Sequence, residues 1–470
     1  MSHARRLVLF FSVSLLLALL LAIPGLAATD FSSLEKAVQS DLAATGTPGA
    51  AVIVVSGDRV VFAKGFGTAN VEIGETGAPV TLDTLFQVGS VTKLLTATAV
   101  VAYAQEGKLR LDAPLGTYVK GLAPRVAEVT VAQLLSQTSG MRDEPAEYGP
   151  HDESALLAAA RAWKDSDRPL PPGTAFSYSN PGLALAGLAF QEAAGKPFAD
   201  LMDERLFTPL GMSHSTFRPT EAMTRPLSMG HDAKGEGKPT VVRPMADDAR
   251  FWPAGSTLYT SANDLARFVR AFLNGGRLDG RPVLSPAVLS QVATPHADIP
   301  ALFEDGHYGY GLMLFREKGL RVAEHAGTMT GFSGLIRMVP EHHFGLIVLA
   351  NRSGVRLRAT TDEAMRLLLP VKADAPPAER PSLPVSAEER ARLTGFYSAR
   401  WPMEVFEKEG RLFLRRFDQE LEMTKVGDRR FAIRPPGADR PQELVFGPDG
   451  PGGHPLYLHM ALWAFARAAG

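Results

Sequence analysis

The sequence has no cysteine, and this absence excludes several kinds of chemistry at once. Disulfide cross-links, thiolate metal sites and a cysteine nucleophile all require that residue. Its charges also nearly cancel, with 49 basic and 50 acidic residues, so no excess of one sign points to nucleic acid or to an anionic membrane surface. We therefore expect small or neutral partners and no nucleic acid.

Several common catalytic motifs are also missing. There is no G-x-S-x-G elbow, because the segment GFSGL at 331–335 fails at its last position, and there is no H-E-x-x-H zinc motif. His342 and His343 are adjacent but fall in a predicted turn, where a solvated hairpin is the better interpretation. No phosphate loop or dinucleotide fingerprint occurs either. We expect no metal and no cofactor.

Long apolar runs are confined to the first residues. Two arginines precede an apolar stretch from Leu7 to Ile23, and a small-residue site at Ala27 or Ala28 follows it. This order is typical of a secretory signal, which we assign to residues 1–27, so the predicted location is periplasmic or secreted. The apolar run of about 17 residues is at the lower limit for spanning a bilayer, and an uncleaved membrane anchor is the alternative.

The rest of the chain divides into two predicted domains. The full chain has 470 residues, which exceeds the length of one ordinary domain. A Pro-rich segment at 371–387 has the composition of a stiff linker. It separates a large domain at 28–370 from a small β domain at 388–470, in which apolar and polar residues alternate between Gly-rich turns.

The large domain is predicted to begin with an amphipathic helix. Four apolar residues share its buried face: Phe31, Leu34, Val38 and Leu42. Ser32 and Glu35 would form a capping box. Two strands follow, helices fill about 90–290, and strands return after about 308, before a closing helix. This order predicts an α+β fold, with helices flanking one antiparallel sheet that is assembled from both ends of the domain.

The stretch GSVTK places Ser90 and Lys93 three residues apart at the predicted start of an apolar helix. On a helix they share a face, so the amine can reach the hydroxyl. Burial and the positive end of the helix both favour the neutral amine, which can then take the proton of a serine nucleophile. The alternative is a capped helix with a snorkelling lysine, and a second S-x-x-K, Ser33 to Lys36, is assigned to ordinary helix surface.

Two further segments carry candidate site residues. In FSYSNPG, Tyr178 beside a lysine cation could ionise and act as a base, and Asn180 offers a donor and an acceptor to a substrate amide. In EHAGTMTGFSG, His325 ends a predicted strand, Gly327 permits close approach of a substrate backbone, and the Thr328 N–H is a candidate oxyanion donor. Taken singly, an Asn-Pro turn and a structural histidine are the alternatives.

Together, the motifs S-V-T-K, Y-S-N and H-A-G resemble those of serine β-lactamases and penicillin-binding proteins, specifically the class C branch. Two more segments resemble that family, LLSQTSGM at 134–141 and PAGSTLYTSANDLARF at 253–268. The resemblance covers about residues 31–370. It implies a β-lactamase/transpeptidase-like fold, in which a helical subdomain lies beside an antiparallel sheet with flanking helices.

The resemblance also implies roles for the candidate residues. Ser90 would form an acyl-enzyme, with Lys93 and Tyr178 moving its proton and activating the water for deacylation. Asn180 would hold the amide side of the substrate. His325, Gly327 and Thr328 would also bind the substrate, with the N–H groups of Ser90 and Thr328 binding the oxyanion.

The sequence departs from the family pattern at two places. His325 stands where most class C β-lactamases have lysine, and a mostly neutral imidazole should bind a substrate carboxylate less well. Ser136 and Gln137 replace the usual Thr-His, which we interpret as a structural variation. The C-terminal β domain resembles the lipocalin-like appendage of related hydrolases.

The resemblance therefore predicts a monomeric serine hydrolase that acts on a small-molecule or peptide substrate, with β-lactamase-type hydrolysis of a β-lactam or related cyclic amide. A D-amino-acid peptidase, a carboxypeptidase or an esterase is the alternative within the family. A penicillin or cell-wall-fragment sensor that does not turn over is the alternative from another class.

Overall fold

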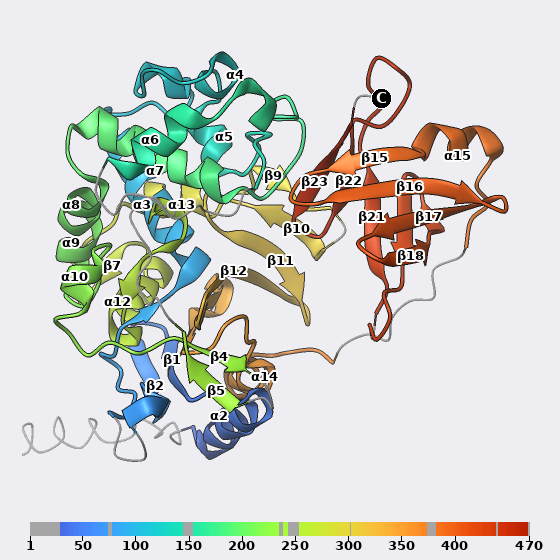
Figure 1. Ribbon diagram of the computed structural model, residues 1–470. Helices are drawn as coiled ribbons and strands as arrows, with labels where there is room; N and C mark the ends of the chain where they lie inside the picture. The colour runs from blue at the N-terminus through green and yellow to red at the C-terminus, as the bar shows by residue number, and fades with distance from the viewer. Residues whose placement is uncertain are drawn as a thin grey trace, which may run out of the picture.

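The computed structural model describes residues 29–73, 78–143, 154–234, 238–242, 253–300, 302–373, 382–438 and 440–468. The predicted signal at residues 1–27 lies outside this part of the chain. The chain forms a large unit of sheet and helices and a smaller C-terminal unit of strands, seen at the right of Figure 1. Within the described ranges, no helix is long and apolar enough to cross a membrane.

The large unit is built on an eight-stranded sheet, in which each strand runs antiparallel to the strands beside it. In sheet order its strands are β2 (Arg59–Gly67), β1 (Gly49–Ser56), β14 (Phe344–Ala350), β13 (Phe332–Val339), β12 (Leu320–Met329), β11 (Met313–Glu317), β10 (Glu304–Tyr308) and β9 (Ala297–Asp298). The hairpin of β1 and β2 from the start of the domain therefore joins the sheet through pairing of β1 with β14, the last strand of the domain. This confirms the predicted α+β fold, in which both ends of the domain supply one antiparallel sheet.

Both faces of this sheet are buried. Along β1, Ile53 and Val55 belong to the core shared with α12 (Ala262–Leu273). Val52 and Val54 point to the opposite face and pack in a second core with α2 (Ser32–Thr45) and α14 (Arg358–Leu368). Because successive side chains of a strand alternate between faces, a strand covered on both sides has to be apolar throughout.

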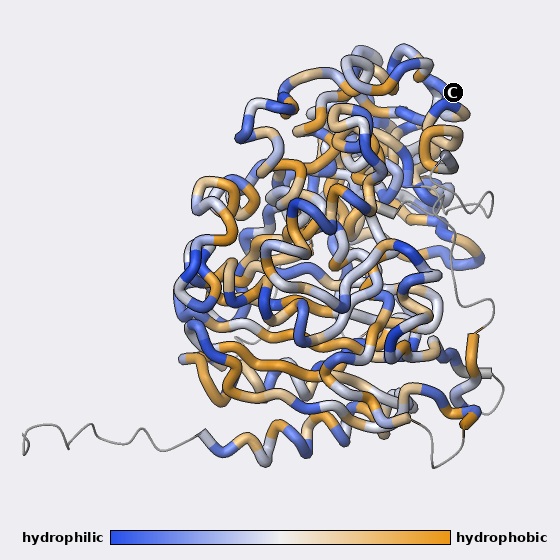
Figure 2. Tube along the Cα trace, turned by 90° about the vertical axis from the view of Figure 1, so that its left-hand side faces the viewer, coloured by the Kyte–Doolittle hydropathy of each residue, from blue (hydrophilic) through white to orange (hydrophobic). Residues whose placement is uncertain are grey.

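Helix α2 follows the predicted amphipathic pattern but not the predicted cap. Leu34 and Val38 are buried, and Figure 2 shows this helix alternating between hydrophobic and hydrophilic residues at the bottom of the molecule. The capping box from Ser32 to Glu35 is wrong. The Asp30 carboxylate instead accepts hydrogen bonds from the Ser32 N–H and hydroxyl, both at 2.9 Å. Glu35 forms an ion pair with Lys64 on β2, with the amine 2.6 Å from its carboxylate.

Helices fill the middle of the large unit, as predicted. They are α3 (Thr92–Gln105), α4 (Pro124–Ala127), α5 (Val131–Leu135), α6 (Ala155–Ala162), α7 (Asn180–Ala194), α8 (Phe198–Met202), α9 (Thr208–Leu210), α10 (Pro219–Ala222), α11 (Pro253–Ser256), α12 and α13 (Pro286–Val292). Short two-stranded sheets lie among them: β3 (Phe86–Gln87) with β6 (Tyr259–Thr260), β4 (His231–Lys234) with β5 (Lys238–Val241), and β7 (Arg277–Leu278) with β8 (Arg281–Pro282).

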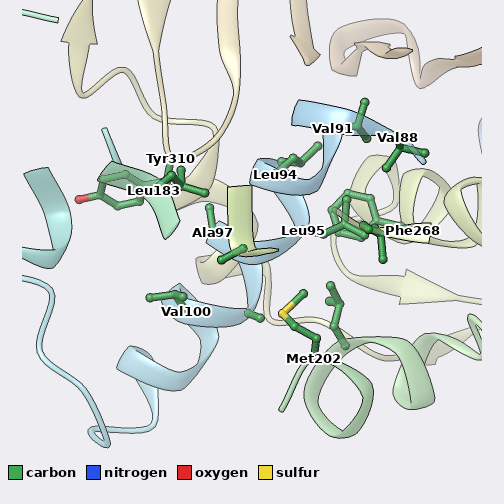
Figure 3. Close-up of a cluster of buried hydrophobic side chains, with 14 of the residues drawn as sticks. Val88, Val91, Leu94, Leu95, Ala97, Val100, Leu183, Met202, Phe268 and Tyr310 are labelled. Atoms are coloured by element: carbon green, nitrogen blue, oxygen red, sulfur yellow. The ribbon is translucent and has the colours of Figure 1, made fainter. Parts of the chain in front are cut away.

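Helix α3 lies at the centre of the large unit and is buried from Thr92 to Val101. Figure 3 shows side chains from several other elements around it, among them Leu183, Met202 and Phe268. A helix that is apolar on every side has to be enclosed. The polar groups at the start of α3 are therefore held in a fixed, largely dry environment.

The C-terminal unit begins with α15 (Ala387–Leu393) and is otherwise one nine-stranded antiparallel sheet. In sheet order its strands are β18 (Gln419–Glu422), β17 (Arg411–Arg416), β16 (Pro402–Lys408), β15 (Gly395–Ser398), β23 (Trp463–Arg467), β22 (Tyr457–Met460), β21 (Gln442–Phe446), β20 (Arg430–Ile433) and β19 (Thr424–Gly427). Most of its buried apolar residues form a core of their own, while Ala464 and Ala466 on β23 pack with Leu170 of the large unit. The predicted small β domain therefore has its own core.

Candidate active site

Ser90 lies in a short 3-10 turn, Gly89–Val91, between β3 and α3. Gly89 has a φ of 54°, and a Cβ there would lie 2.6 Å from the Thr328 nitrogen on β12. Only glycine adopts this conformation readily and allows so close an approach. The turn therefore holds the backbone on either side of Ser90 directly against β12.

The Lys93 side chain points back from the first turn of α3 to Ser90 and is completely buried. Its Nζ lies 3.0 Å from Ser90 Oγ, 2.6 Å from Asn180 Oδ1 and 2.7 Å from the Gly255 carbonyl oxygen. The amide and carbonyl oxygens can only accept hydrogen bonds. When the amine is neutral, its two hydrogens therefore point to Asn180 and Gly255, which leaves the lone pair for the Ser90 hydroxyl.

Burial lowers the pKa of Lys93 to about 7, and the carboxylate of Asp143 opposes this by raising the pKa. Loss of hydration disfavours the ammonium form, while a nearby negative charge favours it. Near neutral pH, the amine beside Ser90 is thus neutral in a substantial share of molecules. It has the protonation behaviour that a general base requires.

Asn180 begins α7 and connects Lys93 to Asp143. Its Nδ2 and its backbone N–H both donate to Asp143 Oδ1, each at 3.0 Å. This fixes the amide so that its oxygen faces Lys93. Both ends of the side chain are therefore already engaged, and one amide hydrogen and one lone pair are left to meet a substrate.

Tyr178 is buried beside Lys93, whose Nζ lies 4.8 Å from the centre of the phenol ring. The sequence suggested that a neighbouring cation would let the phenol ionise. The structure shows the reverse, because burial raises the pKa of Tyr178 well above 10. A hydrogen bond with the Ser90 side chain opposes the effect of burial without cancelling it. The phenol is thus a neutral proton donor, and Lys93 is the better base.

His325 lies on β12 and is buried, with 1% of the residue exposed. Its Nδ1 is 2.8 Å from the Ala326 carbonyl oxygen, which can only accept, so Nδ1 carries the hydrogen. The unprotonated Nε2 then accepts from the Tyr308 hydroxyl at 3.2 Å. Burial and the nearby Lys93 lower the pKa of His325 to about 3. The ring is therefore neutral and offers no positive charge to a substrate.

Gly327 and Thr328 follow His325 on the same strand, at the point where it passes the Ser90 turn. A Cβ on Gly327 would lie 2.0 Å from the Val88 carbonyl oxygen and 2.7 Å from the Ser90 nitrogen. The backbones of Ser90 and Thr328 are thus brought next to each other. Two backbone N–H groups in such an arrangement can stabilise the negative charge of a tetrahedral intermediate.

Gln137 takes part in the site, although the sequence suggested only a structural variation there. It is buried with a φ of 60°, and its Oε1 accepts the Ser179 N–H at 2.7 Å. Ser179 caps α7 by accepting the Gly182 N–H at 3.1 Å. Gln137 therefore fixes the backbone between Tyr178 and Asn180.

These side chains open into a cleft of about 1740 Å³ between the two units. Ser90, Tyr178 and Asn180 line it together with Arg356 of the large unit and with Arg400 and Trp463 of the C-terminal unit. Across the described ranges, no group of three or more His, Asp or Glu side chains is placed to hold a metal ion.

All seven residues predicted from the sequence lie around this one cleft or against its floor: Ser90, Lys93, Tyr178, Asn180, His325, Gly327 and Thr328. Sequence reasoning missed Asp143, Tyr308 and Trp463. Nothing local marks them, since each acts through a contact with a segment far away in the chain. Gly255 lies in a quoted motif, PAGSTLYTSANDLARF, but its carbonyl contact with Lys93 has no signature in the sequence.

Comparisons with known proteins agree with this geometry. A family model described as Beta-lactamase matches residues 34–369. Penicillin-binding protein 4 of Amycolatopsis lactamdurans is 33% identical over 332 residues, which cover 68% of this chain and 85% of that protein. Protein flp of Staphylococcus aureus (strain N315) is 26% identical over 329 residues, which cover 68% of this chain and 62% of that protein.

Solved structures are similar as well. The crystal structure of SurE has a TM-score of 0.77 at 27% identity and covers 93% of this chain and 98% of its own. The D-alanine carboxypeptidase AmpC of Burkholderia cenocepacia has a TM-score of 0.57 at 25% identity, covering 72% of this chain and 99% of its own. A class C beta-lactamase, with a TM-score of 0.60 over 73% of this chain and 97% of its own, is 21% identical and shares the fold.

Proposed function

Because this chain belongs to the beta-lactamase family, we propose that it is a serine hydrolase that forms an acyl-enzyme on Ser90. The contact between Lys93 Nζ and Ser90 Oγ, 3.0 Å long, carries this proposal. A serine hydroxyl needs a base to become a nucleophile, and an amine with a pKa of about 7 is such a base at neutral pH.

In the proposed reaction, Lys93 takes the hydroxyl proton as Ser90 Oγ bonds to the substrate carbonyl carbon. The N–H groups of Ser90 and Thr328 stabilise the resulting oxyanion. When the intermediate collapses, the leaving amine or alcohol takes the proton from Lys93, directly or through the neutral Tyr178 hydroxyl. Water then attacks the acyl carbon and gives one proton to Lys93. As the bond between Ser90 Oγ and that carbon breaks, Lys93 returns the proton to Oγ and the carboxylic acid leaves.

We propose that a peptide or ester acyl donor is the preferred substrate, ahead of a small β-lactam. The cleft of about 1740 Å³ exceeds the roughly 300–1,000 Å³ typical of small-ligand pockets. The neutral, buried His325 provides no cation for the carboxylate of a penicillin. Relatives described as a penicillin-binding protein and a D-alanine carboxypeptidase support D-amino-acid peptides within this class.

Turnover of a β-lactam, the reaction first suggested by the motifs, is the second candidate. Arg356 is exposed in the cleft and is near enough to His325 to lower the pKa of that ring. Its guanidinium is therefore available as a cation for a substrate carboxylate near the third motif. A penicillin sensor that acylates without hydrolysis would use the same groups and differ only in deacylation.

Covalent labelling tests the nucleophile. A fluorophosphonate or a fluorescent penicillin should label the wild-type protein and leave Ser90→Ala unlabelled. The matched control is Ser33→Ala, which changes the serine of the second S-x-x-K, on the surface of α2, and should be labelled like the wild type. Equal labelling of Ser90→Ala and the wild type would rule out the proposed mechanism.

A substrate panel tests the reaction. We expect continuous hydrolysis of a D-amino-acid amide or a short-chain p-nitrophenyl ester to exceed hydrolysis of nitrocefin. Faster nitrocefin turnover would overturn this order in favour of a β-lactamase. A burst of one equivalent followed by a stop, with every compound, would instead identify a sensor.

We also propose that the protein is exported, from the pattern of its first residues. Sequencing the amino terminus of the mature protein tests this, with a start near Ala28 expected and an intact Met1 contradicting cleavage.

A further inference from the structure

The turn between β22 and β23, residues 461–462, and Trp463 at the start of β23 lie against the segment that carries the candidate catalytic tyrosine. The Leu462 carbonyl oxygen accepts the Tyr178 backbone N–H at 2.8 Å. Next to this contact, Ser177 Oγ accepts the Ala464 N–H at 3.2 Å. A strand end of the C-terminal unit is therefore hydrogen-bonded to the backbone of Tyr178.

Trp463, at the start of β23, also supports Asp143. The Asp143 side chain is 2% exposed, and Oδ2 accepts the Trp463 indole Nε1–H at 3.1 Å. The other oxygen, Oδ1, holds Asn180 by two hydrogen bonds. A buried carboxylate requires donors on both oxygens. Trp463 supplies one of these donors from the other unit.

Arg400, the other donor near Oδ2 of Asp143, is a weaker partner than Trp463. Arg400 Nη1 lies 3.5 Å from Oδ2, and the Arg400 side chain is 44% exposed. Solvent screens such a contact, whereas the indole is held in place by the Trp401 ring, with the two ring centres 5.3 Å apart. Trp463 is therefore the better-defined support of the two.

We propose that the C-terminal domain contributes a residue, Trp463, to the active site, and that Trp463 and Asp143 are positioning residues for Lys93. Trp463 holds Asp143, Asp143 orients the amide of Asn180, and the Asn180 oxygen fixes the Lys93 amine against Ser90. This proposal rests on the proposed acylation of Ser90. It assigns the role to a domain that the family model, which ends at residue 369, does not cover.

Replacing the indole tests the first link. Trp463→Phe keeps an aromatic ring and removes the hydrogen bond to Asp143. The rate of Ser90 labelling by a fluorophosphonate should fall about tenfold, because a hydrogen bond to a charged group is lost. Trp401→Phe is the matched control, since Trp401 lies in the same aromatic cluster and its buried Nε1 has no hydrogen-bond partner among the described residues. An equal fall in both variants would reduce the effect to packing and overturn the proposal.

The pH profile tests the second link. The Asp143 carboxylate raises the pKa of Lys93, so Asp143→Asn should move the acid limb of the labelling rate to lower pH. Trp463→Phe keeps the charge and should lower the rate without moving that limb. A purely structural role for Asp143 would lower the amount of active protein and leave the midpoint in place, which would contradict the proposal.

Hydrogen exchange of the Trp463 indole, which does not depend on any reaction at Ser90, separates this proposal from the proposed function. In a 1H–15N spectrum of the full chain, the Trp463 indole N–H, identified by its loss in Trp463→Phe, should exchange with water more slowly than an exposed indole does. Asp143→Ala should speed this exchange. Slow exchange with no labelling of Ser90 would refute the hydrolase alone, whereas unprotected exchange with normal labelling would refute the positioning role alone.

Discussion

At the scale of single residues, the environment of Lys93 decides the chemistry. The side chain is completely buried at the positive start of α3, and Asn180 connects it to the carboxylate of Asp143. Burial outweighs the carboxylate, and the pKa falls to about 7. A tenfold change in the acid dissociation constant corresponds to about 1.4 kcal/mol between the two protonation states.

This lowered pKa predicts the pH dependence of acylation. Lys93 is protonated and unable to act as a base below its pKa, so the labelling rate should rise through pH 7 and level off above it. Lys93→Arg, which stays charged at every accessible pH, should lose at least about a hundredfold in rate. A stopped-flow pH series on the wild type that stays flat between pH 5 and 9 would contradict this role.

Gly327 yields a second prediction at this scale. A methyl group there would meet the Val88 carbonyl and the Ser90 nitrogen, so Gly327→Ala must displace the backbone that presents the oxyanion donors. We expect the acylation rate to fall about a hundredfold, comparable to the loss of one such donor. Gly452→Ala, where the nearest atom to the new Cβ would be 3.8 Å away, is the control and should react normally.

At the scale of elements, the start of α7 matters most, since it carries Tyr178, Ser179 and Asn180 within three residues. Gln137 and the Leu462 carbonyl each accept one backbone N–H of this segment. The motif thus depends on acceptors from two other parts of the chain. That dependence explains why a buried glutamine is kept at a φ of 60°, a conformation in which most residues other than glycine are strained.

Removing the acceptor of Gln137 tests this explanation. Gln137→Leu has a similar size but leaves the buried Ser179 N–H without a partner, which should lower the free energy of unfolding by about 1–3 kcal/mol. Urea unfolding followed by fluorescence measures the change. The labelling rate should fall together with stability, and a variant as stable and reactive as the wild type would contradict the role of Gln137.

At the scale of the whole molecule, the two units meet through a buried histidine as well as through Trp463. His459 on β22 packs beside Phe176, with ring centres 6.2 Å apart, and burial lowers its pKa to about 4. Unfolding exposes the ring and returns its pKa to about 6.5. Between these two values the unfolded chain binds the proton more strongly, so stability falls as the pH drops from about 6.5 to about 4.

The interface should therefore be sensitive to acid. In His459→Leu, the loss of unfolding free energy between pH 7 and pH 4.5 should shrink by about 2–3 kcal/mol compared with the wild type. His325, whose pKa is also lowered by burial, contributes acid sensitivity to both proteins and cancels in this comparison. Urea unfolding at the two pH values measures the difference, and equal losses in both proteins would exclude His459 as the cause.

The sequence by itself determined the features that depend on near neighbours in the chain. Ser90 and Lys93 share one turn, so their spacing alone brings the amine to the hydroxyl. The order of strands and helices along the chain likewise predicted one antiparallel sheet assembled from both ends of the domain.

The tertiary structure alone decided which distant groups surround that pair. Only after folding does Gly255 approach Lys93, Asp143 approach Asn180 and Trp463 approach Asp143, and no local pattern records such contacts. Burial, which cannot be read from a short motif, made Tyr178 a proton donor instead of a base and left His325 uncharged. Protonation depends on the solvent and charges around a group, and these are properties of the folded chain.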